Sequence, residues 1–457
     1  MPYEKTTIAA IATAPAAGGI GIVRISGEKA LSVADKIFKT KKGLLLSDSE
    51  GYRAYYGMVY SKETPVDEAI CLIFRGPKSF TGEDTAEIHC HGGIFVSQSV
   101  LRAALDAGAL PAQAGEFTKR AYLNGRLSLD RAEAVMSLVC AQGDQAAKAA
   151  LNVLEGSLAE KINESVAKLT RLAAGFGAWV DFPDEDIEDT SPEELRAVFT
   201  EVLESLKSLA ENYDRGRAVI NGVETVIVGR PNVGKSTLMN LLAGYEKSIV
   251  TDFAGTTRDI VEETVMLGPL VLHMADTAGL RDTDNPVEKI GVERALKKLD
   301  RASLILAVFD GSDILTDDDK MLLEKCAGRP TLALINKTDL PRSLDLEYIS
   351  EKVDKLVEIS ASKGEGLQAL EKAALEVLGA DTFDPSAAMV ANERQRSCIL
   401  RAADMLEEAL KDLDRGMTYD ALALYNDAAI EALLELKGEK VSDAVVDEIF
   451  SAFCVGK

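Results

Sequence analysis

The segment Gly229-Arg-Pro-Asn-Val-Gly-Lys-Ser236 is the most informative part of this 457-residue chain. It fits the pattern Gly-x-x-x-x-Gly-Lys-Ser/Thr of a phosphate-binding loop, here called the phosphate loop. It stands between a β-branched run and an apolar stretch expected to be helical, Thr237–Leu242. Its glycines let backbone N–H groups wrap around phosphates, and the helix N-terminus adds positive potential. We expect Lys235 to reach the β- and γ-phosphates and Ser236 to offer its hydroxyl to Mg²⁺.

Strand and helix patterns alternate around this loop, from about Gly222 to Leu378. This alternation predicts an α/β domain with a doubly wound parallel sheet. Its strands are expected at Glu224–Val228, Leu270–Ala275, Leu304–Phe309, Thr331–Ile335 and Leu356–Ile359.

Three later segments of this unit carry groups suited to a guanine nucleotide. After the second strand, Asp276 can hold Mg²⁺ through water, and Gly279 lets a backbone N–H approach the γ-phosphate. At the end of a later strand, Asp339 can accept from the N1–H and 2-amino groups of guanine, which adenine cannot satisfy. After the last strand, the backbone of Ser360–Ser362 can meet the guanine carbonyl. These elements resemble the GTPase superfamily. The predicted contacts are Asn232, Val233, Gly234, Lys235, Ser236, Thr237, Asp276, Thr277, Ala278, Gly279, Asn336, Lys337, Thr338, Asp339, Ser360, Ala361 and Ser362.

One position departs from the Ras pattern. The residue after Gly279 is Leu280, where Ras-type GTPases have a glutamine that orients the attacking water. Hydrolysis must therefore find a water-positioning group and extra positive charge elsewhere. Asn232 has a side-chain oxygen suited to a monovalent cation, and the hydroxyl-rich loop Thr251–Asp259 could close over that cation, with Thr257 as an Mg²⁺ ligand. The alternative is that this loop is a simple connection.

Composition excludes several classes of protein. The chain is 47% hydrophobic with a mean hydropathy of +0.01, so it can bury several cores and is not largely disordered. No apolar run approaches the ~20 residues of a membrane span, and no signal peptide is evident. Six dispersed cysteines suit neither a disulfide framework nor a Cys-x-x-Cys metal site, which indicates a reducing cytoplasm.

The net charge of −23 argues against attraction of nucleic acid to the whole surface. Residues 1–125 are the exception, with 14 Lys+Arg against 13 Asp+Glu. A polyanion should therefore meet this part, or a partner protein, before the rest of the chain.

The pattern of elements predicts a multidomain chain. Residues 1–124 suit a small α+β domain, with strands near Ile20–Ile25, Tyr55–Tyr60, Ala69–Phe74 and Ala86–Cys90 and a helix over Phe95–Ala107. Residues 125–220 and 380–457 have helical periodicity. Within them, the apolar residues from Leu151 to Leu169 are expected to line one helix face, and Ser191, Pro192 and Glu194 mark the start of another helix. We expect the GTPase domain, residues 221–379, to be inserted into this all-α domain.

Taken together, these features resemble the MnmE (TrmE) family of tRNA-modifying GTPases over essentially the whole chain. The resemblance rests on Gly229–Ser236, Gly255–Asp259, Asp276–Leu280, the inserted GTPase unit, the terminal Phe453-Cys-Val-Gly-Lys457, and the stretches Ala9–Ser26, Thr81–Asp84, Glu87–Gly93 and Gly115–Leu127.

The resemblance implies a cytoplasmic homodimer, formed through the N-terminal domain, that binds 5-formyl-tetrahydrofolate or a related one-carbon folate there. It also implies GTPase domains that meet in a K⁺-dependent way. With the FAD-binding partner MnmG, such proteins add a carboxymethylaminomethyl or aminomethyl group at carbon 5 of the wobble uridine of certain tRNAs.

The same resemblance implies residue roles. Glu288 matches the water-orienting glutamate, and Cys454 matches a functional thiol near the folate; with Lys235 they are the catalytic candidates. Folate contacts fall on Arg24, Glu87, Arg126 and Lys457. Further nucleotide contacts are Thr251, Asp252, Phe253, Ala254, Gly255, Thr256 and Thr257. K⁺ would be held by Asn232, Thr251, Phe253 and Thr256, and Mg²⁺ by Ser236 and Thr257. Judged alone, Glu288 is an ordinary glutamate at a helix start and Arg24 an ordinary surface arginine.

Other interpretations stay open at this level. A ribosome-assembly GTPase resembling Era or Der shares the GTPase core, but it carries a basic RNA-binding module that is not evident here. A dynamin-type GTPase would need a basic amphipathic face, also not evident. His89-Cys-His91 could suggest a metal site, but no third ligand has suitable spacing, so we interpret it as structural.

Overall fold

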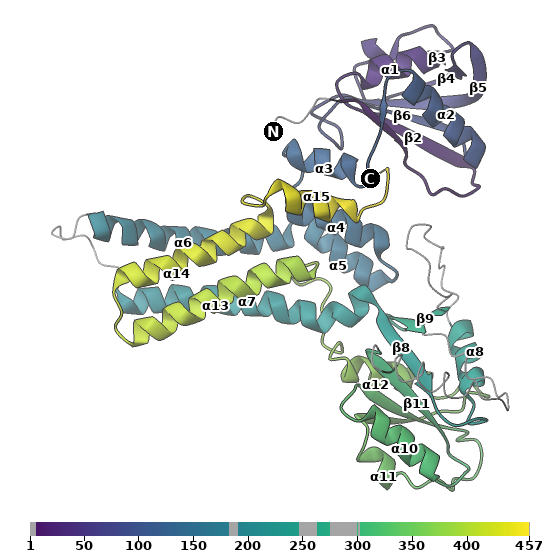
Figure 1. Ribbon diagram of the computed structural model, residues 1–457, viewed down its shortest axis with the longest axis vertical. Helices are drawn as coiled ribbons and strands as arrows, with labels where there is room; N and C mark the ends of the chain where they lie inside the picture. Colours follow the sequence, from purple (N-terminus) through teal and green to yellow (C-terminus); the bar gives the residue numbers. More distant parts are fainter. Residues whose placement is uncertain (1–5, 182–190, 246–262, 275–298, 300–301, 457) are drawn as a thin grey trace. The chain divides into compact units, whose positions relative to one another are not determined.

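The computed structural model describes residues 6–181, 191–245, 263–274, 299 and 302–456 (Figure 1). They form two compact units, one of residues 1–136 with 431–457 and the other of residues 137–430, and each is described by itself. Within the described ranges, no helix has both the length and the apolar character needed to cross a lipid bilayer.

The first unit contains a seven-stranded sheet in the order β3-β4-β5-β6-β2-β1-β7. Neighbouring strands are antiparallel except β1 and β7, which are parallel. The four strands predicted from the sequence are present, together with the predicted helix, and the α+β interpretation of this part is confirmed. The strands are β1 (Ile8–Ile11), β2 (Ile20–Ser26), β3 (Phe38–Thr40), β4 (Arg53–Ser61), β5 (Thr64–Phe74), β6 (Thr85–His91) and β7 (Leu110–Pro111).

The two faces of this sheet differ in polarity. Helices α1 (Ala30–Ile37) and α2 (Ile94–Asp106) bury Val23, Ile25 and Ile88 of strands β2 and β6. Since successive strand residues point to opposite faces, Arg24 and Glu87 belong to the other face. A short 3₁₀ helix, η1 (Leu46–Asp48), precedes β4.

The C-terminal segment completes the first unit. Helices α3 (Glu116–Leu123), α4 (Leu129–Cys140) and α15 (Asp443–Ser451) share a small apolar core that includes Leu129, Phe450 and Phe453. Val455 then forms an antiparallel bridge with Ala114. The segment that carries Val455 is therefore held against the segment that carries Ala114.

The second unit contains a six-stranded sheet in the order β13-β12-β11-β8-β10-β9. All neighbours are parallel except β9 and β10, so the predicted parallel sheet is confirmed, and β9 is an edge strand that the sequence analysis missed. The strands are β8 (Val223–Val228), β9 (Glu263–Leu267), β10 (Leu270–Met274), β11 (Leu304–Asp310), β12 (Thr331–Asn336) and β13 (Lys355–Glu358).

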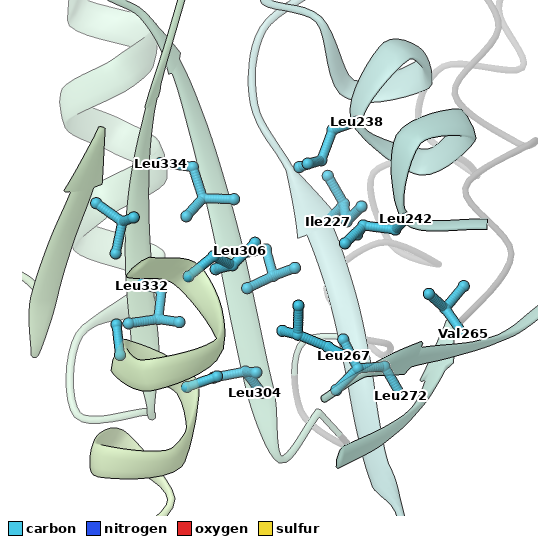
Figure 2. Packing of buried hydrophobic residues seen from close by; sticks show 14 of the residues in the cluster. Ile227, Leu238, Leu242, Val265, Leu267, Leu272, Leu304, Leu306, Leu332 and Leu334 are labelled. Carbon is cyan, nitrogen blue, oxygen red and sulfur yellow. The ribbon is translucent and has the colours of Figure 1, made fainter. Parts of the chain in front are cut away.

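Helices bury both faces of this sheet. Figure 2 shows Leu238 and Leu242 of α8 (Lys235–Tyr245) against Ile227 of β8. Helix α12 (Leu367–Val377) packs into the same core, whereas α10 (Asp317–Cys326) and α11 (Glu347–Ser350) pack into the core on the opposite face. This burial fixes the strand ends from which the polar loops emerge.

Among the described residues of the second unit there are also helices α5 (Asp144–Glu155), α6 (Ser157–Asp181), α7 (Pro192–Asn221) and α13 (Glu393–Asp414), and most of α14 (Tyr419–Lys437). Helix α7 begins with the predicted capping box, because the Ser191 side chain accepts from the backbone N–H of Glu194 and the reciprocal bond is also present. Helices α7 and α13 lie side by side (Figure 1), and Arg396 Nε donates to Asp214 Oδ1 at 2.8 Å. The helices that flank the α/β part in sequence thus pack on each other.

One expectation about the helices was wrong. The residues from Leu151 to Leu169 do not line a single helix, because Gly156 ends α5 in a left-handed conformation with φ of 108°. Leu151 is consequently exposed, whereas Leu158 and Leu169 of α6 are buried.

Candidate functional site

The phosphate loop joins the end of β8 to the start of α8. Gly229 has φ of +151°, and a β-carbon there would lie 2.4 Å from the carbonyl oxygen of Val308. Gly234 has φ of +100°, and a β-carbon there would lie 2.2 Å from the Asn336 side chain. Both positions therefore require glycine. Asn232 is exposed and adopts φ of +64°, a left-handed conformation that asparagine tolerates better than most residues.

Lys235 is anchored to the loop that it closes. Its Nζ donates to the carbonyl oxygens of Gly229 at 2.8 Å and Arg230 at 2.6 Å. The next two residues, Ser236 and Thr237, are exposed in the first turn of α8, where helix geometry offers backbone N–H groups to an anion. The predicted phosphate ligands therefore lie together at the end of β8.

Asn336 joins two other loops of the site. Its Nδ2 donates to the carbonyl oxygen of Val233 at 2.8 Å, and its Oδ1 accepts from the backbone N–H of Ala361 at 3.0 Å. Asn336 is 3% exposed. Both hydrogen bonds are therefore shielded from water, and this side chain connects the phosphate loop to the segment Ser360–Ser362.

Lys337 forms an ion pair that the sequence analysis did not anticipate. Its Nζ lies 2.6 Å from Oδ2 of Asp310, the last residue of β11. Burial works to raise the pKa of Asp310, but hydrogen bonds from Lys337 and Ser312 outweigh burial and lower that pKa. The signal available in sequence was an acidic residue at the carboxyl end of a buried parallel strand, where ligand sites gather.

The predicted guanine-binding carboxylate is held by a neighbouring loop. Ser360 is fully buried, and its Oγ donates to Oδ1 of Asp339 at 2.7 Å. That hydrogen bond is the main reason why the pKa of Asp339 is lowered, so the exposed carboxylate stays ionised at neutral pH. Ser362 Oγ lies 3.2 Å from Ser360 Oγ. An ionised acceptor at this place can pair with the two donors on the edge of guanine.

The cation ligands predicted among the described residues fit hard cations chemically. Ser236 offers a hydroxyl oxygen and Asn232 a carboxamide oxygen, which are ligand types suited to Mg²⁺ and K⁺. In the part of the chain that the structure describes, no group of three or more His, Cys, Asp or Glu side chains is placed to hold a metal ion. The other predicted nucleotide and cation ligands, Thr251–Thr257 and Asp276–Gly279, lie outside the described residues, as do Glu288 and Lys457.

A second cluster lies on the polar face of the N-terminal sheet. Arg24 and Glu87 are register partners on β2 and β6, and Arg24 Nε donates to Glu87 Oε1 at 2.8 Å. The guanidinium carbon of Arg24 also lies 5.5 Å from the ring centroid of Phe117 and 5.9 Å from that of Phe80. A guanidinium flanked by aromatic rings and a carboxylate suits a planar, charged ligand.

The C-terminal segment reaches this cluster. Arg24 Nη1 donates to the carbonyl oxygen of Gly456 at 3.3 Å, and the carbonyl oxygen of Cys454 accepts from the backbone N–H of Gly115 at 3.3 Å. The Cys454 side chain is half-buried and its thiol is free. Arg24, Glu87 and the segment that carries Cys454, all predicted to serve the folate site, therefore lie close together.

Arg126 contacts the loop that carries Phe80. Its Nε donates to the carbonyl oxygen of Ser79 at 3.2 Å, and its Cγ lies close to Gly82. The sequence analysis predicted Arg126 as a site residue but did not name Phe80. Phe80 stands out only in the structure, where this large aromatic side chain is 40% exposed beside Arg24.

Known proteins similar in sequence cover essentially the whole chain. Residues 7–126 match the family model described as GTP-binding protein TrmE N-terminus, and residues 129–454 match the one described as MnmE helical domain. The tRNA modification GTPase MnmE of Clostridioides difficile is 40% identical over 100% of both chains, and that of Symbiobacterium thermophilum is 42% identical over 99% of this chain and 100% of its own. A solved structure of an Era variant from Aquifex aeolicus bound to GDP·AlF4⁻ is 27% identical over 40% of this chain and 66% of its own, with a TM-score of 0.27, so the conclusion rests on the relatives and family models. This chain belongs to the MnmE family of tRNA modification GTPases.

Proposed function

We propose that this GTP hydrolase works in tRNA modification. With the FAD-binding partner MnmG, it takes part in adding a carboxymethylaminomethyl or aminomethyl group at carbon 5 of the wobble uridine. The proposal includes a cytoplasmic homodimer, a one-carbon folate bound by residues 1–124, and a K⁺- and Mg²⁺-dependent GTPase domain over residues 221–379 within a helical domain of residues 125–220 and 380–457. The match of residues 7–126 to an N-terminal family model favours this proposal over a ribosome-assembly GTPase.

The observation that carries the proposal is the meeting of the Arg24–Glu87 pair with the C-terminal segment. Arg24 contacts Gly456 although 432 residues separate them. A chain that served only as a nucleotide switch would have no need to bring its last residues to an arginine–glutamate pair. The arrangement supports a ligand site in which Arg24, Glu87 and Arg126 hold the folate, with Lys457, while Cys454 stands nearby.

The proposed cation dependence is based on Asn232 in the phosphate loop and on Leu280, which stands where Ras-type GTPases have a glutamine. Leu280 cannot orient water, so a cation held by Asn232 would supply the positive charge that the transition state needs. Thr251, Phe253 and Thr256 would complete its shell, Thr257 would join Ser236 on Mg²⁺, and Glu288 would orient the attacking water.

The test compares GTP hydrolysis by the full chain in potassium and in sodium buffer. We expect hydrolysis to be faster in K⁺ by at least about tenfold, the scale of one transition-state charge contact. Asn232→Ala should abolish the difference, whereas Asn240→Ala, which changes an exposed asparagine on α8, should retain it. Equal wild-type rates in the two salts would contradict the cation mechanism.

The folate site is tested separately by equilibrium dialysis of 5-formyl-tetrahydrofolate against the full chain. Arg24→Ala should remove binding. Arg53→Ala, which changes an exposed arginine on β4 of the same sheet, should not. Retention of folate by the Arg24→Ala protein would place the ligand elsewhere.

A further inference from the structure

The side chain of Arg230 leaves the phosphate loop and binds two carboxylates at the start of α10. Its Nε donates to Oδ1 of Asp319 at 2.9 Å, and its Nη2 donates to Oδ2 of Asp313 at 3.2 Å. Burial works to lower the pKa of Arg230, but the attraction of Asp319 and Asp313 outweighs burial and raises that pKa. Arg230, the second residue of the phosphate loop, is thus held by Asp319, which lies 89 positions later in the sequence.

Asp319 is itself fixed. It is 1% exposed, and its second oxygen, Oδ2, accepts from both the backbone N–H and the hydroxyl of Thr316 at 3.0 and 2.8 Å. Thr316 and Asp319 form the capping box of α10. Because Asp319 is buried and held by two bonds from Thr316, its ion pair with Arg230 costs less side-chain freedom than an exposed pair does.

The backbone of Arg230 in turn positions Lys235. The carbonyl oxygens of Gly229 and Arg230 both accept from Lys235 Nζ. The other half of the loop is held by the bond from Asn336 to the carbonyl oxygen of Val233. The loop, with its left-handed residues at 232 and 234, is therefore held on two sides by side chains.

We infer that Arg230 is a positioning residue for nucleotide binding, which acts with Asp313 and Asp319 to hold the phosphate loop and Lys235 in the shape that accepts phosphates. The guanidinium is already paired with two carboxylates, so its role is to fix the loop rather than to neutralise phosphate charge. This role concerns GDP and GTP alike and does not depend on potassium.

The test is the equilibrium affinity of the full chain for mant-GDP and mant-GTP in sodium buffer, followed by kcat and KM in potassium. Arg230→Gln should weaken both affinities by about tenfold, the effect of losing one charge-assisted pair. The KM for GTP should rise by a similar factor, while kcat at saturation falls by less. Arg230→Lys should recover part of the affinity, because an ammonium keeps the positive charge but lacks the planar fork that reaches the two carboxylates from different nitrogens.

Two matched variants separate the ion pair from the helix around it. Asp317 lies in the same helix turn as Asp319, but its side chain is 97% exposed and pairs with Lys320. Asp317→Asn should therefore leave the affinity for mant-GDP unchanged. Thr316→Ala removes the hydroxyl that donates to Asp319 Oδ2 but keeps the bond from the backbone N–H and both carboxylates that face Arg230, so it should weaken affinity less than Arg230→Gln does.

Three outcomes would overturn the inference. They are wild-type mant-GDP affinity in Arg230→Gln, an equal loss in Thr316→Ala, or an unchanged affinity in Asp319→Asn. Where Arg230→Gln does not fold, Asp313→Asn serves instead, since it removes one half-exposed carboxylate from the pair. A smaller loss of nucleotide affinity in this variant supports the inference, and an unchanged affinity refutes it.

Discussion

The side-chain nitrogen of Asn336 lies 2.8 Å from the carbonyl oxygen of Val233, and the same side chain accepts from Ala361. Asn336, predicted from the sequence as a nucleotide contact, thus uses its side chain to hold three loops together. These two hydrogen bonds fix the phosphate loop and the segment Ser360–Ser362 relative to each other.

Loss of that side chain should be costly. Asn336→Ala leaves a buried carbonyl and a buried N–H without partners, which costs about 1–3 kcal/mol for each group. We expect a lower thermal unfolding midpoint and an affinity for mant-GDP reduced by at least about tenfold. Asn336→Asp has the same size and keeps the acceptor for Ala361, but it cannot donate to Val233. It should also lose affinity, and wild-type binding by either variant would contradict the assigned role.

Asp339 should decide which purine is bound. Asp339→Asn replaces an acceptor by a group that can donate, so it mismatches guanine and matches the 2-oxo group of xanthine. We expect the affinity for GTP to fall by about two orders of magnitude and the affinity for XTP to rise, since mismatched polar groups are left unpaired. Competition of both nucleotides against mant-GDP measures this.

The matched variant for this prediction is Ser360→Ala. It removes the hydroxyl that donates to Asp339 but leaves the carboxylate in place. It should weaken GTP binding less than Asp339→Asn and keep the preference for guanine. A gain of XTP binding in Ser360→Ala would show that the carboxylate is not the discriminating group.

The sequence predicted the α/β sheet well because its central strands are buried on both faces. Strands such as Leu304–Asp310 and Thr331–Asn336 read as continuous apolar runs, a pattern with few alternatives at that length. Strand β9 lies at the edge and β7 has two residues, so neither has such a pattern. Motif spacing likewise predicted that Lys235 follows β8 and Asp339 follows β12, as the structure shows, while their contacts with a nucleotide stay predictions.

The remaining contacts could not be predicted because they join distant parts of the chain. Nothing local to Arg230 indicates that its partners are Asp313 and Asp319, and nothing local to Gly456 indicates its contact with Arg24. Such pairs are decided by tertiary packing. The family resemblance predicted Arg24 and Glu87 as folate contacts, and the fold shows only that they lie close to each other and to the C-terminal segment.

The ion pair of Asp310 and Lys337 should make stability depend on pH. The pKa of Asp310 is lower in the folded chain than its unfolded value of 3.8. A group of this kind stabilises the fold above its unfolded pKa, and the stabilisation is lost as the pH falls through the folded pKa. Asp310→Asn should therefore lower the thermal unfolding midpoint at pH 7, and the gap to wild type should narrow below about pH 4. Melting curves from pH 3 to 7 test this. Asp318→Asn, an exposed position on α10, should show no such gap.

Gly456 should be needed to seat the C-terminal segment. It has φ of +98°, and a β-carbon there would lie 2.4 Å from the carbonyl oxygen of Ile11. Because that oxygen is part of the backbone, Gly456→Ala should displace the segment rather than be absorbed by a side chain. We expect faster alkylation of Cys454 and, under the proposed function, weaker folate binding.

The rate of Cys454 alkylation can be referred to exposed Cys140 in the same molecule by mass spectrometry. Gly43→Ala is the matched control, because Gly43 has φ of +68° but a β-carbon there would meet no atom within 4 Å. It should introduce backbone strain of about 1 kcal/mol without releasing the C-terminal segment. If Gly456→Ala left Cys454 as protected as in the wild type, the docked position of the last residues would not be the one that limits access to the thiol.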